Sequence, residues 1–292
     1  MLVNTRDIRT TIEKANGRNL CKRGTRPISV GMCITFVSWK RLKMRIVLAA
    51  GLAIFAGPVF ADQLADFIAG KIKNCEGCDL QGANFKKADL TGANLTGANL
   101  ANATFHRATL RGAILTGVDA TDANFNKANL TQAQMGKGNY SRAMFYGAQM
   151  SGADLSGANL TGAMMQTARL TSAKLTDAVL DRAIMYNVMA NSSDFRNSSL
   201  LRTNLKGAHL GRSLFDGAII QSSVFIKVKA SRASFVDTTI SLSDFYGSDL
   251  RRAKVEGAII TGNRFTTAAT RNVDFSTATM SGNIMANGRL KN

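Results

Sequence analysis

The sequence predicts an all-β solenoid over residues 75–292, in which the chain winds through about eleven four-sided coils. Two periodicities indicate this fold: apolar residues recur every five positions, and phenylalanines recur every twenty. A period of five fits neither a helix, with a period of about 3.6, nor a simple strand, with a period of about 2. The chain must therefore turn a corner every five residues, with two side chains of each five pointing inward.

The five-residue period is unbroken from Leu80 to Leu290. Every position divisible by five in this range is apolar, except Thr270. The residue two positions earlier is small, as at Ala83 and Ala93, and the remaining three positions are mostly polar or Gly. We therefore expect one small and one large side chain of each repeat to be buried.

The phenylalanines show how many corners make one coil. When the apolar centres are sorted by their position modulo twenty, all repeat-region phenylalanines fall in two of four columns. A ring every twenty residues predicts stacking between successive coils, so that a coil has about twenty residues and four sides. The predicted core ladder consists of Phe85, Phe105, Phe125, Phe145, Phe195, Phe215, Phe225, Phe235, Phe245, Phe265 and Phe275.

The repeat that begins Ala88-Asp89-Leu90-Thr91-Gly92 resembles the pentapeptide-repeat family. This resemblance implies a right-handed quadrilateral β-helix. The best understood members of the family bind DNA gyrase by imitating the shape and negative charge of duplex DNA. The resemblance therefore gives an alternative function, a cytosolic target binder of the DNA-mimic type. A DNA mimic needs a negative face, whereas Lys and Arg outnumber Asp and Glu in residues 46–292.

Residues 44–61 have the three-part pattern of a secretory signal peptide. A basic start is followed by an apolar run over residues 46–56, and cleavage is expected after Ala61. The run is short for a membrane span, which needs about 20 residues, so a retained anchor is the less favoured alternative. We expect an exported protein, periplasmic or secreted.

Residues 1–43 precede this signal and show no sustained apolar period. We interpret them as an upstream extension, either disordered or the product of a start site assigned too early. Residues 1–45 hold eleven Lys and Arg but only two acidic residues, and so carry half of the formal net charge of +18. The exported rod would therefore be only moderately basic.

Both ends of the solenoid carry distinctive sequence. Residues 62–74 place Leu64, Phe67, Ile68 and Ile72 at helical spacing. They predict a short helix that caps the first coil; docking to a partner or a membrane surface is the alternative. The other end finishes within the repeat, without a capping helix. An open solenoid end invites association, so an end-to-end homodimer through the C-terminal coil is a hypothesis.

Cys75 and Cys78 begin the first coil. They are either small inward residues or a disulfide formed in an oxidising compartment. Two thiols alone cannot complete a tetrahedral zinc site, so a metal or redox role is less favoured.

No catalytic, cofactor or metal site is predicted. The only histidines, His106 and His209, lie about five coils apart, roughly 25 Å at the spacing of paired strands. No nucleophile–base pair or phosphate-binding glycine loop stands out. We therefore predict that the protein is not an enzyme and has no cofactor.

Outward cations recur at twenty-residue spacing. Lys87, Arg107 and Lys127 form one such column near the N-terminal end. Near the other end, two neighbouring columns share a corner. Their members are Arg212, Arg232 and Arg252 in one column, and Arg251, Arg271 and Lys291 in the other. The two C-terminal columns are either a solvated surface or a strip that binds a polyanion, such as an envelope glycan, an anionic lipid or a nucleic acid. No outward aromatic residue interleaves with them, which disfavours nucleic acid.

The sequence therefore predicts an exported, non-catalytic structural or interaction solenoid. It would display a regular, moderately basic surface to a protein or to an anionic polymer of the cell envelope, neither of which the sequence identifies.

Overall fold

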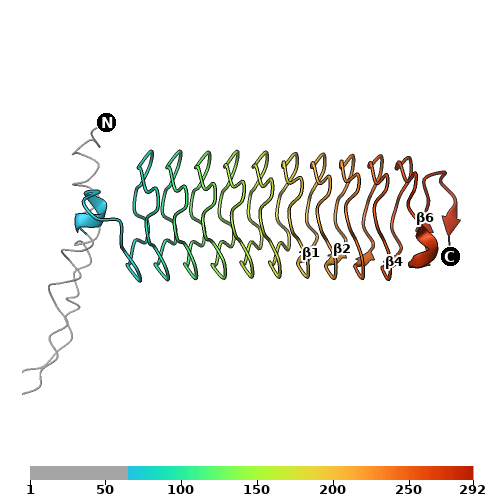
Figure 1. The fold of residues 1–292 in the computed structure, drawn as a ribbon, viewed down its shortest axis with the longest axis horizontal. Coiled ribbons are helices and arrows are strands. Elements are labelled where there is room, and N and C mark those ends of the chain that lie inside the picture. Colours follow the sequence, from blue (N-terminus) through green and yellow to red (C-terminus); the bar gives the residue numbers. More distant parts are fainter. Residues whose placement is uncertain (1–64, 292) are drawn as a thin grey trace, which may run out of the picture.

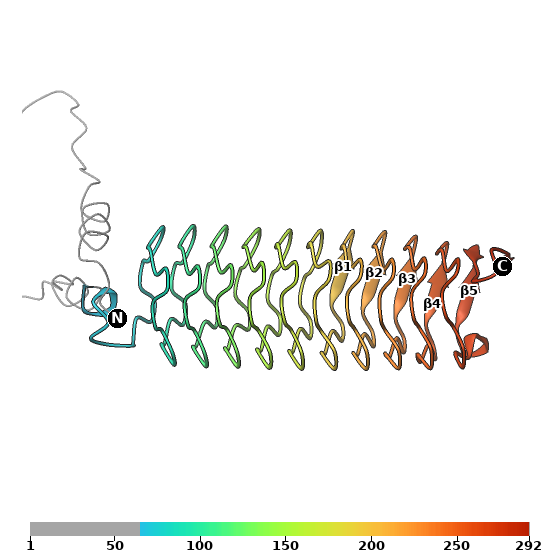
Figure 2. The same cartoon turned by 90° about the horizontal axis from the view of Figure 1, so that it is seen from above.

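The computed structural model describes residues 65–291, which form a straight rod of stacked coils (Figure 1). A short helical turn precedes the rod at one end, and a small hairpin follows it at the other (Figures 1 and 2). The predicted upstream extension, the signal peptide and the start of the capping helix, including Leu64, lie outside the described residues.

Each coil pairs with the next through parallel β-bridges between residues that are twenty positions apart. The amide of Leu95 donates to the carbonyl of Ile114 (2.8 Å), and the amide of Ile114 donates back to the carbonyl of Ala93 (2.9 Å). The predicted coil of twenty residues is therefore confirmed. One ladder has eleven members, which agrees with the predicted number of coils: Asn84, Thr104, Asn124, Met144, Met164, Ile184, Asn204, Val224, Asp244, Arg264 and Ile284.

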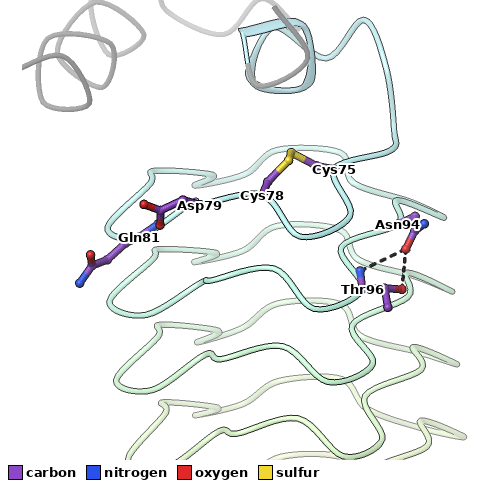
Figure 3. The surroundings of a disulfide bond; sticks show 6 residues. All are labelled: Cys75, Cys78, Asp79, Gln81, Asn94 and Thr96. Carbon is purple, nitrogen blue, oxygen red and sulfur yellow. Dashed lines mark hydrogen bonds between the residues drawn. A yellow bond between two sulfur atoms is a disulfide. The ribbon is translucent and has the colours of Figure 1, made fainter. Parts of the chain in front are cut away.

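Each corner is a tight turn whose second residue has a positive φ, for example 66° at Gly92. The amide of Ala93 closes that turn on the carbonyl of Leu90 (3.0 Å). Asn94 shapes the following corner, because its side-chain oxygen accepts from the amide and the hydroxyl of Thr96 (3.1 and 2.7 Å; Figure 3). The recurring Asp and Asn are thus turn-forming residues.

The rod's interior is a set of side-chain ladders. Consecutive members of the predicted phenylalanine ladder stack with ring centroids 4.7–5.2 Å apart, which matches the strand spacing of about 4.8 Å. Phe275 is the exception. It is only half-buried against the core, follows Val255 instead of a ring in its own column, and meets Phe265 of the other column edge-on at 6.1 Å.

Tyr140 is the largest side chain at a central position and is completely buried. Its hydroxyl donates to the carbonyl of Leu115 (3.0 Å), and its ring meets Phe125 and Phe145 edge-on. The small inward position beside it is Gly138 instead of alanine. A Cβ there would lie 2.6 Å from the Tyr140 ring, so the glycine makes room for the tyrosine.

Five strands lie on one side of the C-terminal half and form a parallel sheet (Figure 2). They are β1 (Ser199–Leu201), β2 (Ile219–Gln221), β3 (Thr239–Ser241), β4 (Ile259–Thr261) and β5 (Thr279–Ser281). At the corners that follow β1 and β2, side chains replace the usual backbone closure. The amide of Thr203 donates to the hydroxyl of Ser223 (2.9 Å), and the amide of Ser223 donates to the hydroxyl of Ser243 (3.0 Å).

The C-terminal end departs from the predicted repeat. A 3-10 turn, η1 (Phe275–Thr277), interrupts the last coil, and β6 (Asn283–Ile284) pairs antiparallel with β7 (Leu290–Lys291). Leu290 was predicted to point inward, but it is 62% exposed. The five-residue period therefore predicts a further inward position here that the structure does not have. The chain reverses near Gly288, whose φ is 77°, and β7 pairs with β6 instead of building another coil.

At the opposite end, residues 65–68 are helical. Phe67 is almost fully buried and packs edge-on against Phe85 (5.8 Å), while Ile68 and Ile72 lie against the same core. This turn covers the first coil with the residues that the sequence placed on an apolar face. Over residues 65–291, no helix has the length and apolar character needed to cross a membrane.

Candidate functional site

A surface groove of about 550 Å³ runs along one corner of the C-terminal half. Its walls come from successive coils, so its long direction follows the axis of the rod. Half of the residues that line it are arginines. The complete lining is Asn191, Ser192, Gly211, Arg212, Ser231, Arg232, Arg251, Arg252, Arg271 and Asn272.

Small residues precede large ones along the corner that forms the groove. Gly211 and Ser231 occupy the corner position that holds Arg251 and Arg271 in later coils. The amide of Gly211 donates to the side-chain oxygen of Asn191 (3.1 Å). This bond holds the Asn191 side chain beside the glycine, at the N-terminal end of the groove.

Arg212, Arg232 and Arg252 form one wall of the groove. All three have left-handed backbone, with φ of 60°, 59° and 59°, and the amide of each donates to a carbonyl of the next coil at 2.9–3.1 Å. Successive members are therefore one coil apart, about 4.8 Å along the axis. Within residues 65–291 none of them makes an ion pair, so like charges are stacked without compensation.

Arg251 differs from the other arginines because it has an acidic partner. Its guanidinium donates two hydrogen bonds to the Asp249 carboxylate (2.8 and 2.7 Å). These bonds are the main reason that the pKa of Asp249 is lowered, and this carboxylate is therefore ionised at neutral pH. The net positive charge of the groove comes from Arg212, Arg232, Arg252 and Arg271.

Lys291 does not join this site. The sequence predicted that it would stack on Arg271, but β7 runs antiparallel and places Lys291 opposite Asn283. Its assignment to the strip is therefore wrong, for the same reason that Leu290 is exposed.

The N-terminal column of cations has the same corner geometry. Lys87, Arg107 and Lys127 have φ of 61°, 58° and 58°. Burial lowers the pKa of the neighbouring His106, and Arg107 and nearby lysines lower it further, so this imidazole is neutral at neutral pH. The column is a matched comparison for the groove arginines.

Cys75 and Cys78 form a disulfide at the start of the first coil (Figure 3). Of the two interpretations left open by the sequence, the structure thus contains the bonded pair. Cys75 is fully buried at a central position, so the disulfide also serves as core. Across the part of the chain that the structure describes, no cluster of His, Cys, Asp or Glu could hold a metal ion.

Sequence reasoning identified the arginines but missed the neutral half of the site. Asn191, Ser192 and Asn272 line the groove because the stacking of the coils brings them beside the arginines. The signal that could have found the groove is the pair Gly211 and Ser231, because small residues before Arg251 and beside a column of arginines leave a gap.

Comparison with known proteins identifies the repeat. Family models described as pentapeptide repeats match in eight copies, over residues 78–117, 105–139, 123–162 and 165–200. Residues 78–162 and 165–200 of this chain are thus pentapeptide repeats, as the sequence predicted. No curated protein matches it significantly in sequence.

Solved structures resemble the rod. HetL from Nostoc sp. strain PCC 7120, a pentapeptide-repeat protein involved in heterocyst differentiation regulation, matches with a TM-score of 0.54 and 24% identity, over 79% of this chain and 98% of HetL. QnrB1, a plasmid-mediated fluoroquinolone resistance protein, matches with a TM-score of 0.43 and 18% identity, over 63% and 87% of the two chains. Rfr23 from Cyanothece 51142 matches with a TM-score of 0.39 and 24% identity, over 41% and 94%. At these identities the HetL match supports the β-helix fold and does not indicate a partner.

Proposed function

We propose that this protein is an exported, non-catalytic interaction solenoid that holds an anionic polymer or an acidic protein surface along its arginine groove. The observation that carries the proposal is the gathering of four arginines around one hollow. They are Arg212, Arg232, Arg252 and Arg271, and none of the four makes an ion pair within residues 65–291.

Electrostatics supports a polymeric anion as the ligand. The backbones of Arg212, Arg232 and Arg252 lie one coil apart, so their positive charges repel one another. A bound anion relieves that repulsion while it makes charge-assisted hydrogen bonds. Arginine is suited to this role because its planar fork matches carboxylate and phosphate groups. Such binding displaces counterions, so it weakens steeply as salt is added.

Export is supported by the signal-like pattern over residues 44–61 and by the disulfide, since disulfides persist in oxidising compartments. The alternative, a DNA-mimic binder in the cytosol, would need a negative face. The groove presents the opposite charge.

The test of binding is retention on immobilised heparin as a function of salt. Replacing Arg212, Arg232 and Arg252 by Gln should lower the salt concentration needed for elution. The matched control replaces Lys87, Arg107 and Lys127 by Gln, which removes the same charge from the other end of the rod. Equal shifts in the two triple variants would mean that net charge alone governs retention, and the groove would lose its role.

Export is tested separately with a secretion reporter fused after Asp62. Residues 1–62 should deliver the reporter outside the cytoplasm, and a second fusion that starts at Met44 should do so equally well. A reporter that stays in the cytoplasm in both fusions would overturn the exported assignment and leave heparin binding unaffected.

A further inference from the structure

We infer that the ligand of the groove is an acidic polysaccharide, a hydroxyl-rich chain with about one carboxylate per sugar. The inference rests on the proposed polyanion-binding function and names the class of polymer. It depends on what lies between the arginines, on the direction of the groove and on its size.

The uncharged part of the lining is polar or small throughout. It consists of Asn191, Ser192, Gly211, Ser231 and Asn272, and no aromatic or aliphatic side chain contributes to the groove. Proteins that bind single-stranded nucleic acids stack bases on aromatic rings, and a lipid acyl chain needs an apolar wall. This groove offers neither surface.

The neutral side chains can accept hydrogen bonds as well as donate them. Ser192 and Asn272 lie at opposite ends of the groove, and their side chains make no hydrogen bond among the described residues. A hydroxyl and an amide each combine donor and acceptor atoms. Ionised phosphate and sulfate oxygens only accept, so a polyphosphate would accept hydrogen bonds from the arginines but could donate none to these oxygens. Sugar hydroxyls supply donors and acceptors together.

The arginine spacing suits a polymer of sugars laid along the rod. The stacked Phe195 and Phe215 rings measure the rise of one coil in this half as 4.7 Å. A pyranose ring with its glycosidic oxygen spans nearly that length, so the sugar repeat of a chain laid along the rod nearly matches the arginine repeat. The axial rise per phosphate along one strand of duplex DNA is about 3.4 Å, which does not match the rise of one coil.

The size of the groove indicates an oligomer. Its volume of about 550 Å³ far exceeds that of a single inorganic anion, and it lies within the range of about 300–1,000 Å³ that is common for ligand sites. Because the lining spans the coils from Asn191 to Asn272, several sugars in a row would be in contact.

The test measures binding of the purified protein to four probes at one salt concentration. The probes are hexagalacturonate, a neutral hexasaccharide, and a polyphosphate and an oligothymidylate of the same charge as hexagalacturonate. We expect hexagalacturonate to bind at least tenfold more tightly than either charge-matched polymer, and the neutral sugar to bind least. Replacing Arg212, Arg232 and Arg252 by Gln should weaken all three anionic probes.

A variant that fills the groove tests whether binding depends on the shape of the groove or only on its charge. Ser231→Gln keeps the net charge and inserts a longer side chain between Gly211 and Arg251. The corner tolerates this residue, since Gln81, Gln166 and Gln221 occupy the equivalent position in other coils. Hexagalacturonate should lose at least tenfold in affinity, whereas polyphosphate should change less than twofold. An unchanged melting temperature confirms that the variant is folded.

The outcomes distinguish the two levels of the proposal. If the charge-matched polymers bind as tightly as hexagalacturonate, or if Ser231→Gln leaves hexagalacturonate unaffected, the groove responds to charge alone and the polysaccharide assignment is overturned. Preferential binding to phosphatidylglycerol vesicles would overturn it in favour of a lipid surface. If the triple arginine variant binds every anionic probe like the wild type, the proposed function itself is overturned.

Discussion

In the N-terminal half of the rod, alanine fills almost every small inward position, whereas from Ser193 onward serine, threonine and asparagine fill many of them. Every fully buried polar residue identified within residues 65–291 lies at or after Ser193. Their side chains have partners, because no buried side-chain nitrogen or oxygen in the described chain lacks a hydrogen bond. Ser193 and Ser213, for example, donate to the carbonyls of Leu170 and Ala190, each at 2.6 Å.

The two halves therefore close their coils by different means. In the first half the backbone closes the corner, as from Ala93 to Leu90, and the alanine only fills space. In the second half the inward side chain also bonds to the preceding coil, and at the β1–β5 side it replaces the backbone closure. Replacing an inward methyl group should cost little stability. Replacing a hydroxyl that satisfies two buried polar groups should cost more, because those groups lose their hydrogen-bond partner. The halves should therefore differ in their sensitivity to mutation.

The largest expected effect tests the core that both halves share. Phe125→Ala removes a ring that is stacked between Phe105 and Phe145 and should destabilise the protein by about 3–5 kcal/mol. Phe275→Ala is the matched control, because that ring is half-buried and not stacked, and its loss should cost much less. Urea unfolding of both variants measures the difference. Equal costs would contradict the stacked ladder.

Next in size is Gly138→Ala in the alanine-lined half. The added methyl group would lie 2.6 Å from the Tyr140 ring, and overpacking of this kind costs about 1–3 kcal/mol. Thermal unfolding should show a lower melting temperature, and a second change, Tyr140→Leu, should recover part of it. A melting temperature that does not fall for the single variant would mean that the ring can move aside.

A paired substitution sharpens the comparison between the halves. Ser223→Ala removes the acceptor of the Thr203 amide and the donor to the Leu200 carbonyl, so it should cost about 1–3 kcal/mol. Ala153→Ser in the first half should cost less than about 1 kcal/mol, because a hydroxyl there can donate to the preceding coil as Ser193 does. Urea unfolding gives both values. Similar costs would remove the proposed difference between the halves.

The smallest expected effect concerns the groove. Asp249→Asn breaks the ion pair with Arg251 and should raise heparin affinity by a few-fold. The folded pKa of Asp249 is lowered, so the ion pair is intact at neutral pH and is lost as the pH falls through that lowered pKa. Affinity for a sulfated polymer should therefore rise on acidification in the wild type, and the rise should be smaller in the variant. Identical pH profiles would show that Asp249 does not restrain Arg251.

Most of the fold could be predicted because one regularity recurs in every coil. The five-residue period located the buried positions, and the phenylalanine columns gave the number of sides. What could not be predicted depends on contacts between columns. Gly138 resembles an ordinary variation of the repeat until Tyr140 is placed beside it. Likewise, Leu290 follows the periodic pattern, but no further coil is built for it to join, and the chain folds back on β6.

The candidate site was also predictable only in part. Twenty-residue spacing alone predicts that Arg212, Arg232 and Arg252 lie in one column. The hollow between the arginines was not visible, because it results from what Gly211 and Ser231 lack. The pairing of Arg251 with Asp249 also requires the actual direction of the side chains.

The coil of twenty residues also limits how the length of this protein can change. Deleting or duplicating one five-residue repeat upstream of the groove would rotate every later residue of the rod by one side relative to the earlier ones. Aromatic rings would then meet aliphatic columns at the junction. A whole coil can be gained or lost with all columns still aligned. Insertions and deletions compatible with this architecture therefore come in multiples of twenty residues, and each one adds or removes one step of its surface pattern.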